Sequence, residues 1–111
     1  MRYLNLRDGC IIIKHKFRAI PTEVDGIKFA SKKEAKRFRE LRLLKKSGEL
    51  LFFIRQTPWH LPGNTKYISD FFCFWKDGNA TVEDVKGMRT PMYILKKKQV
   101  EALYGITITE I

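Results

Sequence analysis

Two runs of sequence decide the fold: Tyr67-Ile68-Ser69-Asp70-Phe71-Phe72-Cys73-Phe74-Trp75 and Ala80-Thr81-Val82-Glu83-Asp84-Val85-Lys86. Most of their residues are aromatic, β-branched or otherwise apolar, a composition typical of strands. The four residues between them, Lys76-Asp77-Gly78-Asn79, contain the strongest turn signals of the chain. The sequence therefore predicts two antiparallel strands, over residues 67–75 and 80–86, joined by a hairpin.

The length of the hairpin loop determines which charged side chains share a face of the sheet. Side chains alternate along a strand, so Asp84 and Lys86 lie on one face and Glu83 on the other. A three-residue loop, Asp77-Gly78-Asn79, places Asp70 with Asp84 and Lys86, whereas a two-residue loop places Asp70 with Glu83. We favour the three-residue loop or an equivalent bulge, because it gathers two carboxylates and a lysine around one point. If the loop has two residues, Glu83 replaces Asp84 as the candidate ligand. The ordinary alternative to a metal site is that these residues are solvated charges at strand ends.

Length and charge restrict the class of protein. A chain of 111 residues with 44% apolar residues is expected to form a single globular domain over residues 1–111, with residues 1–15 as an N-terminal extension of uncertain structure. No apolar run approaches the roughly 20 residues that span a bilayer, and the first residues do not resemble a signal peptide, so we expect a cytoplasmic protein. The net charge of +10 favours nucleic acid as the partner.

The remaining segments complete an α/β pattern. Periodicity and turn signals predict a small hairpin over residues 23–29, a helix over 31–47, a strand over 50–61 broken by Pro58, a helix over 90–104 and a final strand over 106–111. The order αβββαβ predicts a mixed central sheet flanked by helices, with three antiparallel strands and a helical crossover into a parallel fourth. The second helix is expected to turn four apolar residues inward: Met92, Leu95, Ala102 and Leu103.

A third carboxylate lies in the first turn of the first helix. Glu34, Phe38 and Leu41 are spaced i, i+4, i+7, so Glu34 borders the apolar stripe that packs on the sheet and could project toward Asp70 and Asp84. The segment Ser31-Lys32-Lys33-Glu34 also fits a capping box, in which Glu34 would bond only the backbone of Ser31. From spacing alone both interpretations stay open.

The order of these acidic residues resembles the PD-(D/E)xK nuclease superfamily. The closest likeness is to small phage-encoded endonuclease-like proteins of that superfamily, and it covers roughly residues 16–111. It rests on four quoted runs: Pro21-Thr22-Glu23-Val24-Asp25-Gly26-Ile27, Ser31-Lys32-Lys33-Glu34-Ala35, Tyr67-Ile68-Ser69-Asp70-Phe71 and Val82-Glu83-Asp84-Val85-Lys86-Gly87. Ser69 stands where the superfamily often has proline, a difference that shapes the strand and removes no ligand. The resemblance implies a restriction-endonuclease-like core.

The resemblance also implies a catalytic role for Glu34, Asp70, Asp84 and Lys86. Asp70 and Asp84 carry the oxygen ligands that Mg²⁺ (or Mn²⁺) prefers, with the backbone carbonyl of Val85 as a further ligand. Glu34 would hold a water molecule or a second ion. Lys86 would orient or help to deprotonate the attacking water, or stabilise developing negative charge.

Basic side chains on both helices are the candidates for DNA binding. They are Lys36, Arg37, Arg89, Lys96 and Lys97. Such contacts to phosphates position a substrate without reading its sequence. Gln56, in the strand over residues 50–61, is a secondary candidate that could reach the site or a phosphate, although an ordinary strand amide is the simpler interpretation.

These features predict a Mg²⁺-dependent DNA endonuclease that hydrolyses phosphodiester bonds. The expected substrate is branched DNA, such as a four-way (Holliday) junction, in phage replication or recombination inside the host cell. The alternative is a non-catalytic basic DNA-binding module that retains the nuclease fold. Paired cuts would need two sites, which predicts a homodimer formed through residues 10–13 or 51–54, although either segment could instead be core.

Overall fold

The computed structural model describes residues 21–85 and 89–111. In chain order, its elements are β1 (Thr22–Val24), β2 (Ile27–Phe29), α1 (Lys32–Ser47), β3 (Leu50–Leu61), β4 (Thr65–Trp75), β5 (Ala80–Asp84), α2 (Pro91–Tyr104) and β6 (Ile108–Glu110). The chain is thus a mixed α/β protein, as predicted. Residues 1–15, including the apolar segment 10–13, and Lys86 lie outside the described residues.

The strands β3, β4, β5 and β6 form one sheet in that order. β3 pairs antiparallel with β4 and β4 pairs antiparallel with β5, whereas β5 pairs parallel with β6. This arrangement confirms the predicted meander and the parallel fourth strand, while β1 and β2 form a separate hairpin. The predicted break at Pro58 is wrong, because β3 is continuous through it. β3 is an edge strand of the described sheet, and edge strands tolerate a residue without an N–H group.

The hairpin between β4 and β5 has a three-residue loop, but it begins one residue earlier than predicted. Phe74 pairs with Ala80, and the Trp75 N–H donates to the Asn79 carbonyl at 2.8 Å, so the loop is Lys76-Asp77-Gly78. Gly78 takes a φ of 94°, a conformation that favours glycine. The shift moves the register by two residues, and it therefore leaves the predicted faces unchanged.

Both helices begin and end where the capping signals predict. The Ser31 side chain accepts a hydrogen bond from the backbone of Glu34, and α1 ends at Gly48 in the left-handed conformation. Thr90 caps α2, with Pro91 in the first turn and Gly105 after the last. Neither helix of the described chain combines the length and apolar character needed to cross a membrane.

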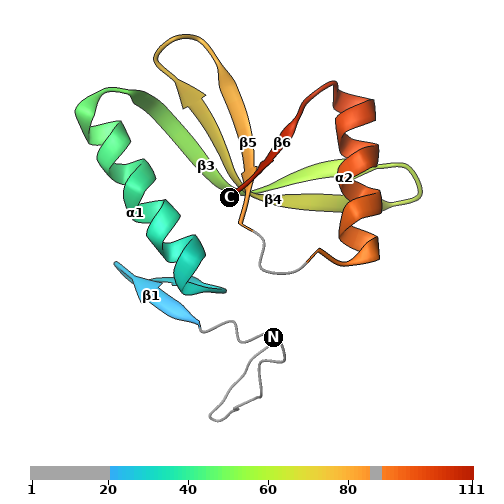
Figure 1. Ribbon diagram of the computed structural model, residues 1–111, viewed down its shortest axis with the longest axis horizontal. Helices are drawn as coiled ribbons and strands as arrows, with labels where there is room; N and C mark the ends of the chain where they lie inside the picture. The colour runs from blue at the N-terminus through green and yellow to red at the C-terminus, as the bar shows by residue number, and fades with distance from the viewer. Residues whose placement is uncertain (1–20, 86–88) are drawn as a thin grey trace.

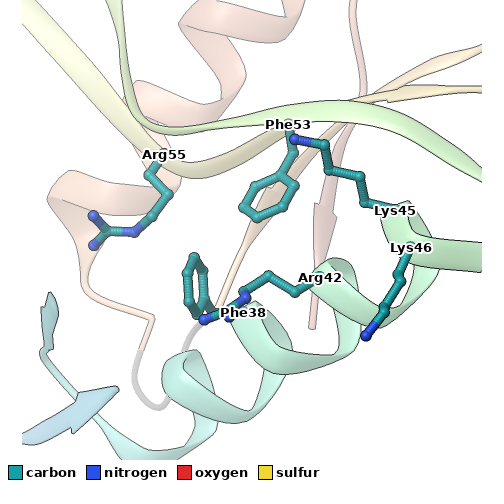
Figure 2. Close-up of a pocket in the computed structure, with 6 residues that line it drawn as sticks. All are labelled: Phe38, Arg42, Lys45, Lys46, Phe53 and Arg55. Atoms are coloured by element: carbon teal, nitrogen blue, oxygen red, sulfur yellow. The ribbon is translucent and has the colours of Figure 1, made fainter. Parts of the chain in front are cut away.

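α1 and α2 lie on different sides of the sheet (Figure 1), and the buried apolar residues form two clusters. The α1 cluster contains Phe29, Ala35, Phe38, Leu41, Leu50, Phe71 and Cys73, with Phe53 packed at its border (Figure 2). The α2 cluster contains Leu61, Tyr67, Val82, Tyr93, Val100 and Ile108.

The inward face predicted for α2 is wrong. Tyr93 and Val100 are buried, whereas Met92, Leu95 and Leu103 are 60%, 51% and 57% exposed and Ala102 is exposed. Sheet contacts therefore select a different stripe of this helix from the one that its largest aliphatic residues suggest.

Candidate acidic site

Asp70 and Asp84 meet on neighbouring strands, on the face predicted for them. Their carboxyl groups share a hydrogen bond, and the Val85 N–H donates to Asp70 Oδ2 at 2.8 Å. Asp84 is only 1% exposed. Burial raises the pKa of Asp70 to about 8, and the hydrogen bond with Asp84 and the charges of Glu34 and Asp84 add to this rise, against the opposing Val85 N–H. The pair therefore retains a proton near neutral pH.

Glu34 joins this pair through Gln56. The Gln56 amide nitrogen lies 3.3 Å from Glu34 Oε2 and, in a weaker contact, 3.5 Å from Asp70 Oδ1. Glu34 is 5% exposed, although it belongs to a residue type that is rarely buried. Its backbone N–H donates to Ser31 Oγ at 3.1 Å, so the Ser31 side chain caps α1. Glu34 thus serves the start of α1 with its backbone and contacts the acidic site with its side chain.

Gln56 has an unusual backbone conformation for a strand residue. Its φ is 52°, in the left-handed region that non-glycine residues seldom occupy. Such strain is found at functional sites more often than elsewhere and has to be held by surrounding contacts. The structure places the Gln56 amide between the carboxylates of Glu34 and Asp70, so this secondary candidate does reach the acidic residues.

Tyr67 contacts the site without having been predicted as a site residue. The Tyr67 hydroxyl donates to Asp84 Oδ2, and burial together with this bond raises the pKa of Tyr67 above its ordinary value. Its ring lies 6.2 Å from the ring of Tyr93 on α2. In sequence, Tyr67 is one more aromatic residue of an apolar strand. Only the hydrogen bond of its hydroxyl to Asp84 on β5 distinguishes it from a core residue.

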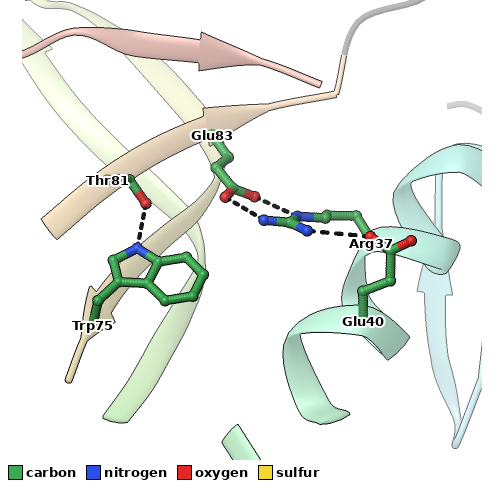
Figure 3. A network of polar contacts seen from close by, with 5 residues as sticks. All are labelled: Arg37, Glu40, Trp75, Thr81 and Glu83. Carbon is green, nitrogen blue, oxygen red and sulfur yellow. Dashed lines mark hydrogen bonds and ion pairs between the residues drawn. The ribbon is translucent and has the colours of Figure 1, made fainter. Parts of the chain in front are cut away.

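Because side chains alternate along β5, Glu83 lies on the opposite face from Asp84. Arg37 and Glu40 of α1 lie beside it (Figure 3). Arg37 donates to both of its carboxylate oxygens, from Nε at 2.8 Å and from Nη2 at 2.7 Å. A third nitrogen of Arg37 lies 3.2 Å from Glu40. This pairing raises the pKa of Arg37 above its ordinary value. The structure thus separates Glu83 from the acidic site and gives Arg37, a predicted DNA ligand, an internal carboxylate partner.

The other predicted DNA-binding residues lie on the surface. Lys36 is exposed on α1, and the Lys96 ammonium donates to the Lys66 carbonyl at 3.1 Å. Arg89 and Lys97 both approach Glu110, at 3.3 Å and 3.6 Å. Lys86, the predicted catalytic lysine, lies outside the described residues.

The atoms brought together here that could bind a metal ion are all oxygens, the ligand type that hard divalent cations prefer. They are the carboxyl groups of Asp70, Asp84 and Glu34, close to the backbone of Val85. Within the described residues, no three His, Cys, Asp or Glu side chains already stand in metal-binding geometry. The Asp70–Asp84 hydrogen bond instead holds two carboxyl groups around a proton. Because ligands must lose their protons to bind a metal, an ion and this proton would compete for one place.

Comparison with curated proteins finds no match to the chain. Residues 14–109 match the family described as "Protein of unknown function (DUF1064)". The matched region includes every described residue of the acidic site. Because the match extends over most of the sequence, this chain belongs to the DUF1064 family.

Proposed function

We propose that this protein is a Mg²⁺-dependent DNA endonuclease with a restriction-endonuclease-like core of the PD-(D/E)xK type. One observation carries the proposal: Asp70 and Asp84 share a hydrogen bond across neighbouring strands, and Gln56 ties Asp70 to Glu34. Groups with perturbed pKa values are concentrated at functional sites, because catalytic acids, bases and ligands need pKa values matched to their chemistry.

The residues fit a hard divalent cation in their chemistry. Asp70 and Asp84 would hold Mg²⁺ or Mn²⁺ directly with the Val85 carbonyl, and Glu34 would hold it through a water molecule. When bound, such an ion neutralises phosphate charge and makes a water molecule more acidic.

The surrounding residues position the acidic groups. Gln56 orients the carboxylates of Glu34 and Asp70, and the Tyr67 hydroxyl orients Asp84. Lys86, two positions beyond Asp84, is proposed to orient the attacking water or to stabilise the charge that develops on the phosphate. These roles are those of a hydrolase acting on a phosphodiester.

DNA is the substrate that the charge of the protein favours, since a net charge of +10 attracts a polyanion. The proposed target is branched DNA in the cytoplasm of a phage-infected host. A symmetric dimer would supply two sites for paired cuts. Leu51, Phe52 and Ile54 of the edge strand β3 are 57%, 44% and 45% exposed and offer a surface for it, whereas Phe53 packs against the α1 cluster.

The decisive experiment incubates the protein with supercoiled, linear, single-stranded and four-way-junction DNA, with Mg²⁺ or with chelator. Wild type should cleave only with Mg²⁺, and Asp70→Asn, Asp84→Asn and Lys86→Ala should each lose cleavage while retaining DNA binding. Asp77→Asn is the matched control, because it makes the same chemical change in the exposed loop of the same hairpin.

Glu34→Gln separates the two roles of Glu34. Glutamine also serves in a capping box, so loss of cleavage with an unchanged melting temperature assigns the side chain to the site. DNA binding without any cleavage by the wild type would instead support the alternative, a non-catalytic DNA-binding module. Cleavage by Asp70→Asn and Asp84→Asn at the wild-type rate would overturn the proposed site.

A further inference from the structure

An open groove of about 560 Å³ runs between α1 and β3, on the same side of the sheet as the α1 cluster (Figure 2). It is lined by Phe38, Arg42, Lys45, Lys46, Phe53 and Arg55. Four of these side chains are cationic and two are aromatic. The groove therefore combines positive charge with flat apolar surface, and no role described above uses it.

The charge in this groove is partly uncommitted. Arg42 pairs with Asp25. In the described part of the chain, neither Lys45 nor Arg55 forms an ion pair with an acidic side chain. The Arg55 Nε atom is buried and has no hydrogen-bond partner there. A buried donor without a partner is costly, so an anion that accepts from Arg55 would be favoured.

Packing holds the aromatic side chains and the arginine in place. The rings of Phe38 and Phe53 lie 5.8 Å apart at 76°. The Arg55 guanidinium carbon lies 4.6 Å from the centre of the Phe29 ring, a cation–π contact that helps to hold the arginine in place. An acidic peptide would use only the cations of such a groove. A nucleotide would use both features, with its phosphate on the cations and its base on a ring.

The groove continues the acidic site along the same two elements. On α1, Glu34, Phe38 and Arg42 follow one another at intervals of four residues and so lie on one face. From Glu34 to Lys45 the helix rises about 16 Å. On β3, Arg55 directly precedes Gln56, which contacts Glu34 and Asp70. A strand with one phosphate at the acidic site could therefore extend along the groove.

We propose that this groove binds single-stranded DNA, the unpaired strand of a branched substrate, with phosphates on Lys45 and Arg55 and a base against Phe53. Its link to cleavage rests on the proposed nuclease function, but the binding itself does not. The groove would then select substrates that carry an unpaired strand next to the bond that is cut.

The test measures fluorescence anisotropy of a labelled oligodeoxythymidine of about 12 nucleotides, within the usual range of ~4–16 per site, in chelator so that no cleavage occurs. Phe53→Leu should weaken binding about tenfold, the loss of one base–aromatic stack. Phe74→Leu is its control, since Phe74 stacks on Phe52 on the other face of the sheet.

The phosphate contacts are tested by the salt dependence of binding. The double variant Lys45→Gln with Arg55→Gln should reduce the slope of log Kobs against log salt concentration by about 1.4, at ~0.7 per phosphate. Lys28→Gln with Lys76→Gln removes the same charge from exposed positions outside the groove and should change the slope much less.

Melting temperatures verify that every variant is folded. If Phe53→Leu binds like wild type, or if an oligoglutamate peptide competes as well as the oligonucleotide, the groove is not a single-strand site. That result leaves the nuclease proposal standing, because junction cleavage in Mg²⁺ is measured separately. Conversely, if the protein binds the oligonucleotide through the groove but never cleaves DNA, the single-strand site is supported and the nuclease proposal is rejected.

Discussion

Glu83 and Asp84 are neighbours in β5, and the two faces of the sheet treat them differently. Both are buried, at 3% and 1% exposure. On the α1 side, Glu83 receives two hydrogen bonds from Arg37, so opposite charges balance inside the fold. On the other side, Asp84 shares a hydrogen bond with Asp70, whose pKa rises to about 8. The first arrangement is complete within the described fold, whereas the second pairs two acids around a proton that a cation can replace.

The largest expected effect comes from breaking the completed pair. Arg37→Met should lower the free energy of unfolding by about 3 kcal/mol, because it leaves the Glu83 carboxylate buried without its partner. Urea denaturation measures the change. Adding Glu83→Leu to Arg37→Met should recover most of the loss, since an apolar pair can replace a buried ion pair. If Arg37→Met is as stable as wild type, the two faces do not differ in the way described.

For the Asp70–Asp84 pair, in contrast, the charged state of a carboxyl group should lower the stability of the fold. The folded-state pKa of Asp70 is raised from 3.8 to about 8, so its contribution to stability is complete below pH 3.8 and is lost as the pH rises toward 8. In chelator, unfolding of the wild type should become easier by on the order of 2 kcal/mol between pH 5 and 8. Asp70→Asn should remove most of this slope while abolishing cleavage. An identical slope in both proteins would show that Asp70 does not carry the proton.

A smaller effect on stability is expected from Gln56, which joins Glu34 on α1 to Asp70 on β4. Gln56→Gly removes the strain of a positive φ, so the free energy of unfolding should stay the same or rise by up to about 1 kcal/mol. The same change removes the amide that contacts Glu34 and Asp70, and cleavage should fall at least about tenfold. Thermal melts and initial cleavage rates measure the two quantities. Loss of stability with unchanged cleavage would give Gln56 a structural role only.

The smallest expected effect on the fold concerns the two faces of β3. Phe52 and Ile54 are exposed on the face opposite the groove. Phe52→Ser with Ile54→Thr should lower the free energy of unfolding by about 1 kcal/mol or less, because both side chains are partly exposed and the main loss is the cross-strand Phe52–Phe74 stack. Light scattering at micromolar concentration should show a dimer for wild type and a monomer for this variant. A wild-type monomer that nicks only one strand would contradict paired cutting and leave the nuclease standing.

Local signals in the sequence were enough to predict the elements and the faces of the hairpin. Ser31, Gly48, Thr90 and Gly105 act within one turn of their own helix, so their effects can be read without the fold. Alternation along β4 and β5 likewise placed Asp70 with Asp84, even though the loop begins one residue earlier than expected.

The misses involve contacts between distant parts of the chain. Arg37 meets Glu83 across 46 positions, and no local pattern shows that this arginine is committed to a carboxylate. Tyr67 meets Asp84 across 17 positions, and the positive φ of Gln56 has no local turn signal beside it. For α2, packing buried Tyr93 and Val100, whereas Met92, Leu95 and Leu103, which were expected to face inward, are exposed.

The most direct test of the central claim is calorimetric titration of the protein with Mn²⁺ at pH 7, in two buffers that differ in ionisation enthalpy. The Asp70–Asp84 pair should bind the ion and release up to one proton, because a folded-state pKa of about 8 leaves Asp70 largely protonated. Asp84→Asn should lose binding, and Asp77→Asn, in the exposed hairpin loop, should bind like wild type. Absence of binding in wild type, or binding that survives in Asp84→Asn, would contradict the account.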